Sequence, residues 1–361
     1  MRNLFQLSSL WRGVGRGAIG GALLWVGLGT TDVARAAPSQ EVMGRFRFSE
    51  LQLSPRLHLE EPGEGGFELE QSSLGFEWSR DEWVRGVLKL GSPDLVRQAF
   101  WYTPKTNGFS VAEAWMEGRG DYGDIRAGLV TVPQGFEGAH PEWNAIFPES
   151  GPRRRGWLLQ RDLGVQFRWE TRPFATSMTI HNGETGPNLD RWLWASGLWE
   201  YRNSDGVGIL LTGSVGHTRP ESTLGAVLPQ AEGFTFDPAK SAKMRYAILT
   251  LYREDRRNLF LVEAGRGELL QEDVKHPYAW GRMDLSWNFA DDMNWLVRYE
   301  QTQSDLRESL TITKKAGMGI VLSSKDNLQS VTLFGSKNSE SGVEVPNDEF
   351  LMIFRLHSNL L

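Results

Sequence analysis

Apolar and polar residues alternate one by one along many short segments of this sequence. Leu163, Val165, Phe167 and Trp169, for example, are separated by single residues such as Gln166. Successive side chains of a β-strand point to opposite faces, so this alternation predicts strands with one apolar and one polar face. We count about sixteen such segments and predict an all-β fold.

The order of the connections narrows this prediction. The predicted strands cover residues 46–59, 67–79, 83–90, 111–118, 124–132, 162–170, 175–181, 193–202, 207–217, 243–253, 258–265, 278–289, 294–303, 311–322, 328–335 and 349–357. Short polar turns such as Ala290–Asp292 follow the even-numbered strands, whereas longer and more variable loops follow the odd-numbered ones. We therefore predict a transmembrane antiparallel β-barrel of about 16 strands with short periplasmic turns and long external loops. A sandwich with Greek-key crossings has no reason to segregate its loops in this way.

The first 36 residues predict export, with a basic start, an apolar core from Gly17 to Gly29 and an Ala34-Arg35-Ala36 cleavage pattern. We assign residues 1–36 to a signal peptide and residues 37–361 to a barrel in the bacterial outer membrane. The sequence carries 39 basic and 45 acidic residues; residues 1–36 hold four arginines and one aspartate, so 35 − 44 leaves a net charge of −9. This acidic balance argues against nucleic acid as a partner.

Three stretches resemble one known family. Gly128–Phe136, Arg161–Gln166 and Ile180–Gly183 resemble the phosphate-selective porin O/P family of Gram-negative outer membranes. The resemblance implies a sixteen-stranded, usually trimeric porin whose third external loop, here residues 134–160, folds into the lumen and narrows it. The chain ends in Ser358–Leu361 without the usual terminal aromatic residue. No lysine-rich row is visible in the lumen, so phosphate specificity is not carried over.

Charged residues on the polar faces of the strands are the candidate lining of a pore. The expected lumen lining includes Arg126, Arg168, Glu170, Arg282, Asp284, Arg298 and Glu300. Because these charges have mixed signs, a narrow point with unbalanced charge would dominate selectivity.

Four arginines are the candidates for that narrow point. Arg153, Arg154 and Arg155 belong to the third loop, and Arg161 stands at the start of the next strand, so that four guanidiniums lie within nine residues. Guanidiniums bind carboxylate or phosphate oxygens well. We predict that they lie at the constriction and favour anions. Two alternatives stay open: the cluster pairs with Glu137, Glu142 and Glu149 of its own loop, or it holds lipopolysaccharide phosphates outside the barrel.

No sequence motif indicates a cofactor, a metal site or a catalytic centre. The six histidines are isolated, and no cysteine is present. We expect a passive pore for small hydrophilic solutes or ions, with outer-membrane lipid and lipopolysaccharide as partners and a homotrimer by resemblance. The rival functions are a rim-site hydrolase, for which His217 is a loose candidate, and a secreted β-rich binding or adhesion protein. The loop 183–190 offers oxygen ligands for calcium without a known spacing, and a plain loop is the simpler interpretation.

Overall fold

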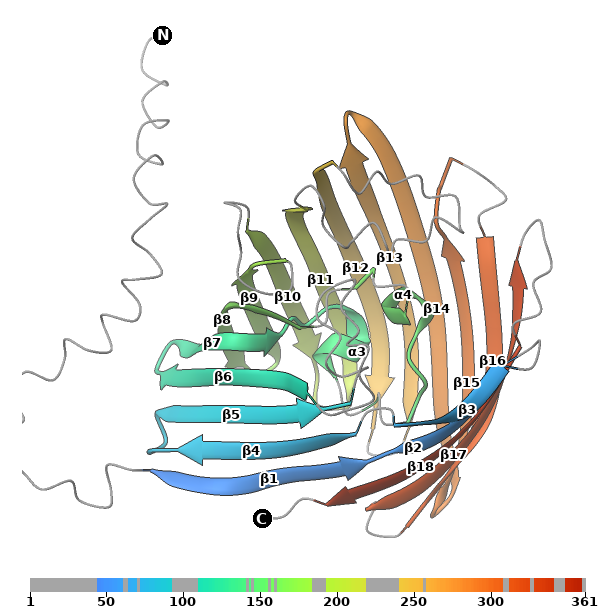
Figure 1. Cartoon of the computed structure of the whole chain (residues 1–361), viewed down its shortest axis with the longest axis horizontal. Coiled ribbons are helices and arrows are strands. Elements are labelled where there is room, and N and C mark those ends of the chain that lie inside the picture. Colours follow the sequence, from blue (N-terminus) through green and yellow to red (C-terminus); the bar gives the residue numbers. More distant parts are fainter. Residues whose placement is uncertain are drawn as a thin grey trace, which may run out of the picture. The chain divides into compact units, whose positions relative to one another are not determined.

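The alternating segments form the strands of one antiparallel sheet (Figure 1). The computed structural model describes residues 44–60, 64–69, 72–92, 110–140, 143, 146–154, 157–158, 161–183, 193–218, 240–255, 258–307, 312–324, 328–340 and 348–358. The first strand segments are β1 (Arg45–Leu53), β2 (Pro55–Glu60), β3 (Glu64–Leu69), β4 (Ser73–Ser79), β5 (Val84–Gly91), β6 (Ser110–Gly120), β7 (Gly123–Thr131), β8 (Arg161–Thr171) and β9 (Phe174–His181). The others are β10 (Trp194–Arg202), β11 (Val207–Thr218), β12 (Ala242–Glu254), β13 (Leu259–Gln271), β14 (Val274–Ala290), β15 (Met293–Gln303), β16 (Ile312–Ser323), β17 (Gln329–Glu340) and β18 (Glu349–Ser358).

The sheet closes on itself between its first and last strands. β1 pairs with both β4 and β18, and β2 pairs with both β3 and β18. β1 and β2 are therefore two halves of one strand interrupted at Ser54, and β3 and β4 are two halves of the next. Ser54 N donates to Ser72 Oγ at 2.9 Å across the two interruptions. The eighteen segments thus make a closed barrel of sixteen strands, as predicted, and closure leaves no unpaired edge.

The apolar face of the strands lies on the outside of the barrel. In β8, Leu163, Val165, Phe167 and Trp169 are 45%, 49%, 41% and 43% exposed, whereas Gln166 between them is 3% exposed. β12 shows the same strict alternation of buried and exposed side chains along its whole length. An apolar exterior is what a lipid-facing wall requires.

The segregation of loops by length is confirmed at one end of the barrel, where every connection is short. It differs from the prediction at the other end, where residues 266–277 were expected to form a longer loop. β13 and β14 instead continue to a two-residue turn, in which Glu272 and Asp273 have φ values of 47° and 66°. The outward positions of these strand ends carry charged residues such as Arg266 and Glu268, so the alternation of apolar and polar residues stops there, although the backbone pairing continues.

The connection between β7 and β8, residues 132–160, is called loop 3 below. It contains two short helices, α3 (Gly135–Ala139) and α4 (Gly151–Arg154), which are drawn inside the ring of strands in Figure 1. Among the described residues no helix is both long and apolar enough to cross a membrane. The predicted signal peptide, residues 1–36, lies outside the described residues.

Loop 3 packs against an apolar part of the inner wall. Its side chains Phe136, Trp143 and Phe147 join one buried cluster with inward-facing residues of the wall. These wall residues include Leu210, Leu261, Leu296, Phe334 and Leu351, from β11, β13, β15, β17 and β18. Loop 3 thus covers one side of the barrel interior and leaves the other side free.

Candidate functional site

A polar cavity of about 1840 Å³ lies inside the barrel between the short turns and loop 3. Turn residues such as Asp121, Arg172 and Asp291 line one end of it, and loop 3 residues such as Gln134 and Arg153 line the other. Many charged and hydroxyl side chains line the cavity beside apolar ones such as Ile146 and Leu198, and a polar space of this size is suited to water.

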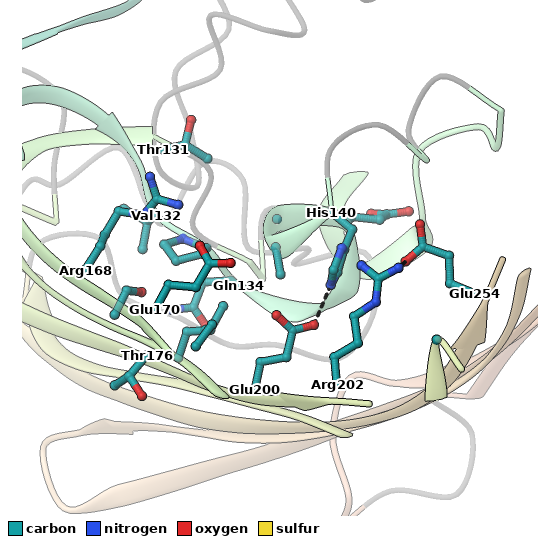
Figure 2. A pocket seen from close by; sticks show the side chains of 18 of the residues that line it. Thr131, Val132, Gln134, His140, Arg168, Glu170, Thr176, Glu200, Arg202 and Glu254 are labelled. Carbon is teal, nitrogen blue, oxygen red and sulfur yellow. Dashed lines mark hydrogen bonds and ion pairs between the residues drawn. The ribbon is translucent and has the colours of Figure 1, made fainter. Parts of the chain in front are cut away.

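Polar side chains face this space from several strands (Figure 2). Arg168 and Glu170 of β8 lie on one side of the view, and Glu200 and Arg202 of β10 lie on the other. His140 of loop 3 reaches down to Glu200. The cavity therefore has one border made of strands and one made of the loop.

Between β5 and β8 the inner wall is open to the cavity and carries alternating charges. Its lining includes Lys89, Glu113, Arg126, Arg161 and Arg168. Arg126 Nη2 donates to Glu117 Oε2 at 2.7 Å, and its guanidinium stacks on the ring of Trp115 at 3.7 Å. Lys89 Nζ lies 2.9 Å from Glu50 Oε1. We call this part of the barrel the free wall.

The residues predicted to line the lumen all project inward, but into two different surroundings. Arg126, Arg168 and Glu170 line the cavity. The other four, Arg282, Asp284, Arg298 and Glu300, are 3%, 2%, 3% and 3% exposed. Loop 3 covers this second group, and these four side chains are not part of the described cavity lining.

The covered charges clamp loop 3 to the wall. Arg298 binds Asp284 in a bidentate pair, with Nε 2.7 Å from Oδ1 and Nη2 2.8 Å from Oδ2, and Nη1 also donates to the carbonyl of Pro148 in loop 3. Arg282 Nη1 lies 2.6 Å from Glu137 Oε1 of α3 and Nη2 lies 3.2 Å from Glu263 Oε1. The contacts of Arg282 are ion pairs rather than aligned hydrogen bonds.

The Glu137 carboxyl illustrates how this cluster tolerates burial. Burial by itself would raise the pKa of Glu137, but the guanidiniums of Arg282, Arg298 and Arg153 outweigh it and hold the pKa below its ordinary value. Ser150 Oγ also donates to Glu137 Oε2 at 2.7 Å. Glu137 is therefore ionised at neutral pH, as its ion pairs with the arginines require.

Two wall carboxylates bind backbone N–H groups of the loop helices. Phe136 N donates to Glu263 Oε2 at 2.7 Å, and Gly151 N donates to Glu300 Oε2 at 2.9 Å. The first N–H groups of a helix lack partners within the helix, so these carboxylates replace a local cap. Gly135 has φ +61°, and a Cβ there would lie 3.0 Å from Glu263 Oε2. A glycine at this position lets the loop approach the wall this closely.

A second polar network holds the root of loop 3. His181 Nδ1 lies 2.8 Å from Asp162 Oδ2, and His181 Nε2 lies 2.8 Å from Ser196 Oγ. The hydrogen bonds continue from the Ser196 hydroxyl to the Ser214 hydroxyl, and Ser214 Oγ also accepts a hydrogen bond from Gln134 Nε2 at 2.9 Å. Four strands and the beginning of loop 3 are thereby joined by one series of hydrogen bonds.

The order Asp162, His181, Ser196 is that of a hydrolase triad, but its surroundings differ. Ser196 is 3% exposed and His181 is 1% exposed. The Ser196 hydroxyl is engaged by Ser214 beneath Gln134, so a substrate carbonyl cannot approach it in this conformation. The network therefore fits a positioning function for loop 3 better than nucleophilic attack.

The four arginines predicted at the constriction are described only in part. Arg153 lines the cavity from α4, with Nε 3.2 Å from Glu149 Oε1, and Arg161 lines it from the start of β8, with Nη2 3.6 Å from Glu113 Oε1. Arg154 belongs to α4, but its side chain and the whole of Arg155 lie outside the described residues. Arg153 and Arg161 thus face the same cavity, each beside an acidic side chain.

The opposite edge of loop 3 is fixed to β10 and β12. His140 Nε2 lies 2.7 Å from Glu200 Oε1, and the Tyr252 hydroxyl donates to the same carboxylate. Trp143 Nε1 donates to Glu254 Oε1 at 2.8 Å. Arg202 and Glu254 approach each other beside this pair in Figure 2, with Nη2 3.1 Å from Oε2.

Sequence reasoning missed two groups of residues at the site. Asp162, His181 and Ser196 were not recognised as a network, because they lie on three strands with no characteristic spacing. The apolar wall beneath loop 3 was missed as well, although β11 and β15 carry apolar residues on both faces. That departure from alternation was the available signal.

Two candidates from the sequence remain, His217 and the loop 183–190. His217, the loose hydrolase candidate, accepts a hydrogen bond from Trp194 Nε1 through its backbone carbonyl at 2.9 Å. Of the possible calcium loop 183–190 only Gly183 is described. Among the described residues, no three His, Asp or Glu side chains are grouped as metal ligands.

The similarity of the chain to known proteins lies in its fold. No protein-family model and no curated protein sequence matches it. The outer-membrane-expressed OmpT of Vibrio cholerae has 12% identity and a TM-score of 0.65, covering 90% of this chain and 100% of that chain. The anion-selective porin from Comamonas acidovorans has 11% identity and a TM-score of 0.60, covering 87% and 100%. The outer membrane channel DcaP of Acinetobacter baumannii has 8% identity and a TM-score of 0.61, covering 90% and 100%. The barrel fold thus matches that of Gram-negative outer-membrane porins in general and does not single out the phosphate-selective porin O/P family.

Proposed function

We propose that the chain is an outer-membrane porin for the passive diffusion of small hydrophilic solutes or ions. The observation that carries the proposal is the polar cavity of about 1840 Å³ inside a closed sixteen-stranded barrel, bordered by a loop that is clamped to one wall. A barrel of this size encloses an aqueous channel, whereas an eight-stranded barrel is filled by its own side chains. The short turns then face the periplasm and the long loops face the outside.

Conductance in a planar lipid bilayer tests this function. We expect the purified, refolded protein to give discrete current steps and to migrate differently on a gel before and after heating. Folded protein that produces no steps would contradict the pore and favour the hydrolase or the secreted binding protein. Hydrolysis of a lipid or peptide that is lost on His217→Ala would support the hydrolase.

We propose further that the pore prefers anions. The supporting geometry is the set of cations around the cavity where loop 3 meets the free wall. This set comprises Lys89, Arg126, Arg153, Arg161 and Arg168. Fixed cations at a narrow point bordered by low-dielectric walls raise the local anion concentration. Arg154 and Arg155 belong to the same proposal by their position in the sequence.

Replacing Arg153 and Arg161 together with serine is expected to shift the zero-current potential in a salt gradient toward cation preference. Glu149 and Glu113 would then lose these partners, and Glu113 lines the cavity. Arg153→Ser, Arg154→Ser and Arg155→Ser combined should act in the same direction. The control is Arg253→Ser, because Arg253 is exposed on the outward face of β12, away from the cavity. An unchanged potential in both combined variants would place these arginines outside the conduction path.

The proposed assembly is a homotrimer, supported by the resemblance to trimeric porins and by the trimer form of the similar Vibrio cholerae OmpT. Lipid and lipopolysaccharide are the proposed surroundings of the apolar exterior. A native mass measurement that yields only monomer from folded, conducting protein would overturn the trimer and leave the pore intact.

A further inference from the structure

Basic side chains gather on the outward face of three neighbouring strands at the long-loop end of the barrel. Lys243 and Arg245 of β12, Arg266 of β13 and Lys275 of β14 are all exposed. We call these four residues the outer basic patch. Arg245 Nη2 lies 3.0 Å from Glu268 Oε1, whereas the side chains of Lys243, Arg266 and Lys275 have no ion pair or hydrogen bond with the described residues. All four charged groups are exposed on the outside of the barrel.

The strand register places the four cations close together. Lys243 pairs with Leu270, which pairs with Lys275, so the two lysines share one row across three strands. Strands lie about 4.8 Å apart, which separates their Cα atoms by about 10 Å. Arg245 pairs with Glu268, so Arg266 is its diagonal neighbour at about 7–8 Å. Long side chains at these separations can reach one headgroup.

Acidic residues near the patch do not cancel it. On the same outward face Glu268 is the partner of Arg245, and the adjoining turn contains Glu272 and Asp273. Glu272 is paired with Lys240, at 2.6 Å between Oε2 and Nζ. Counting the four cations with Glu268 and Asp273 gives the patch a local net charge of 4 − 2 = +2, whereas the formal net charge of the whole chain is −6.

The wall below the patch is apolar. The outward residues of β12 and β13 continue as Leu249 and Leu251 beside Ala264, Val262 and Phe260. Near the short-turn end the apolar face carries a pair of tryptophans, Trp287 and Trp295, which are 59% and 42% exposed. Aromatic residues of this kind mark the interface of a membrane with water.

Measured along the barrel from the short-turn end, the patch lies at the level where the apolar band is expected to end. Arg266 pairs with Ala279 of β14, which lies eight residues before Trp287 on that strand. Lys275 lies twelve residues before Trp287. At about 3.3 Å per residue these are roughly 26 and 40 Å along the strand. A tilt of about 40° reduces them to roughly 20 and 30 Å, and the apolar band of such barrels is about 25 Å tall. The patch therefore straddles the level of the outer-leaflet headgroups.

We propose that the outer basic patch binds the phosphate groups of lipopolysaccharide in the outer leaflet, with the acyl chains lying on the apolar wall below. This inference rests on the proposed outer-membrane location, and not on conduction. Arginine forms paired hydrogen bonds to phosphate oxygens, and lysine adds a point charge. Exposed cations directly above an apolar surface complement an anionic headgroup joined to hydrocarbon chains.

Native mass spectrometry of the refolded protein with purified lipid A tests the proposal. We expect lipid A that carries both phosphates to remain bound, and the variant Lys243→Gln/Arg245→Gln/Arg266→Gln to lose at least about tenfold in affinity. Lipid A without phosphates should bind about as weakly to the wild type as intact lipid A binds to the variant. The matched control is Arg253→Gln, because Arg253 is exposed on the same outward face of β12 near its short-turn end. This control should bind lipid A like the wild type.

Three results would overturn the proposal. The first is equal lipid A affinity of the triple variant and the wild type, and the second is equal affinity of the wild type for lipid A with and without phosphates. The third is a change of oligomeric state in the triple variant without a change in lipid binding. The last result would make the patch a contact between copies of the chain. Heat-dependent gel migration must be the same in all variants, which excludes misfolding as the cause of a loss. Conductance measured on the same samples separates this proposal from the pore, because lipid binding does not require conduction.

Discussion

The variant Arg298→Met is expected to destabilise the barrel by about 3–5 kcal/mol and to increase its conductance. The Arg298 side chain is 2% exposed, and its loss would leave the buried carboxylate of Asp284 without its bidentate partner. The contact with the carbonyl of Pro148, which ties loop 3 to β15, would be lost as well. Urea unfolding in detergent gives the stability, and single-channel recording gives the conductance.

A second variant separates the charge effect from the loss of packing. Adding Asp284→Asn to Arg298→Met removes the uncompensated carboxylate, so part of the lost stability should return while the loop stays released. The control for stability is Arg168→Met, because Arg168 also projects inward but has a 43% exposed side chain and only a 3.9 Å contact to Glu117. Wild-type stability and conductance in Arg298→Met would show that this arginine does not hold the loop.

The variant Asp162→Ala is expected to cost about 3 kcal/mol, because three donors lose the same buried acceptor. Its carboxylate lies 2.8 Å from His181 Nδ1, accepts from Leu163 N at 2.7 Å, and also accepts from Gly183 N. Asp162→Asn keeps an acceptor oxygen and should cost less. Unfolding in urea measures both variants.

Asp124→Ala is the control for this prediction. Asp124 also lies on a strand at the cavity, in β7, but it is partly exposed. We expect it to unfold like the wild type. Equal stability of Asp162→Ala and Asp124→Ala would contradict the importance of the network. Because the network reaches Gln134, Asp162→Ala should also increase the current noise of open channels.

The stretches that resemble a known porin family meet in this network. Asp162 comes from one stretch, His181 and Gly183 come from another, and Gln134 comes from the third. Gly183 has φ +74°, and a Cβ there would lie 1.7 Å from Trp194, so another residue would not fit. The contacts described for these residues fix the root of loop 3. The residues that resemble this family therefore correspond to the geometry of loop 3 rather than to a preference for a substrate.

Much of the fold could be predicted because strand formation leaves a local pattern. The alternation from Leu163 to Trp169 identified both β8 and the outward direction of its apolar face. The pattern failed at residues 266–277, where strands extend beyond the apolar wall and outward residues are charged. It also gave no boundary for α3 and α4, which are too short for helical periodicity to be visible.

The sequence by itself predicted about sixteen strands, the outward direction of the apolar side chains in most of them and the position of the long loop along the chain, because all three follow from neighbouring residues. The tertiary structure alone decided which inward charges meet water and which lie under loop 3. Arg168 and Arg298 occupy equivalent positions in the pattern, yet one lines the cavity and the other is buried. The difference arises from contacts such as Phe136 to Glu263, 127 residues apart, and Pro148 to Arg298, 150 residues apart. Local periodicity contains no information about such pairings, because they depend on how the closed barrel brings the loop against its far wall.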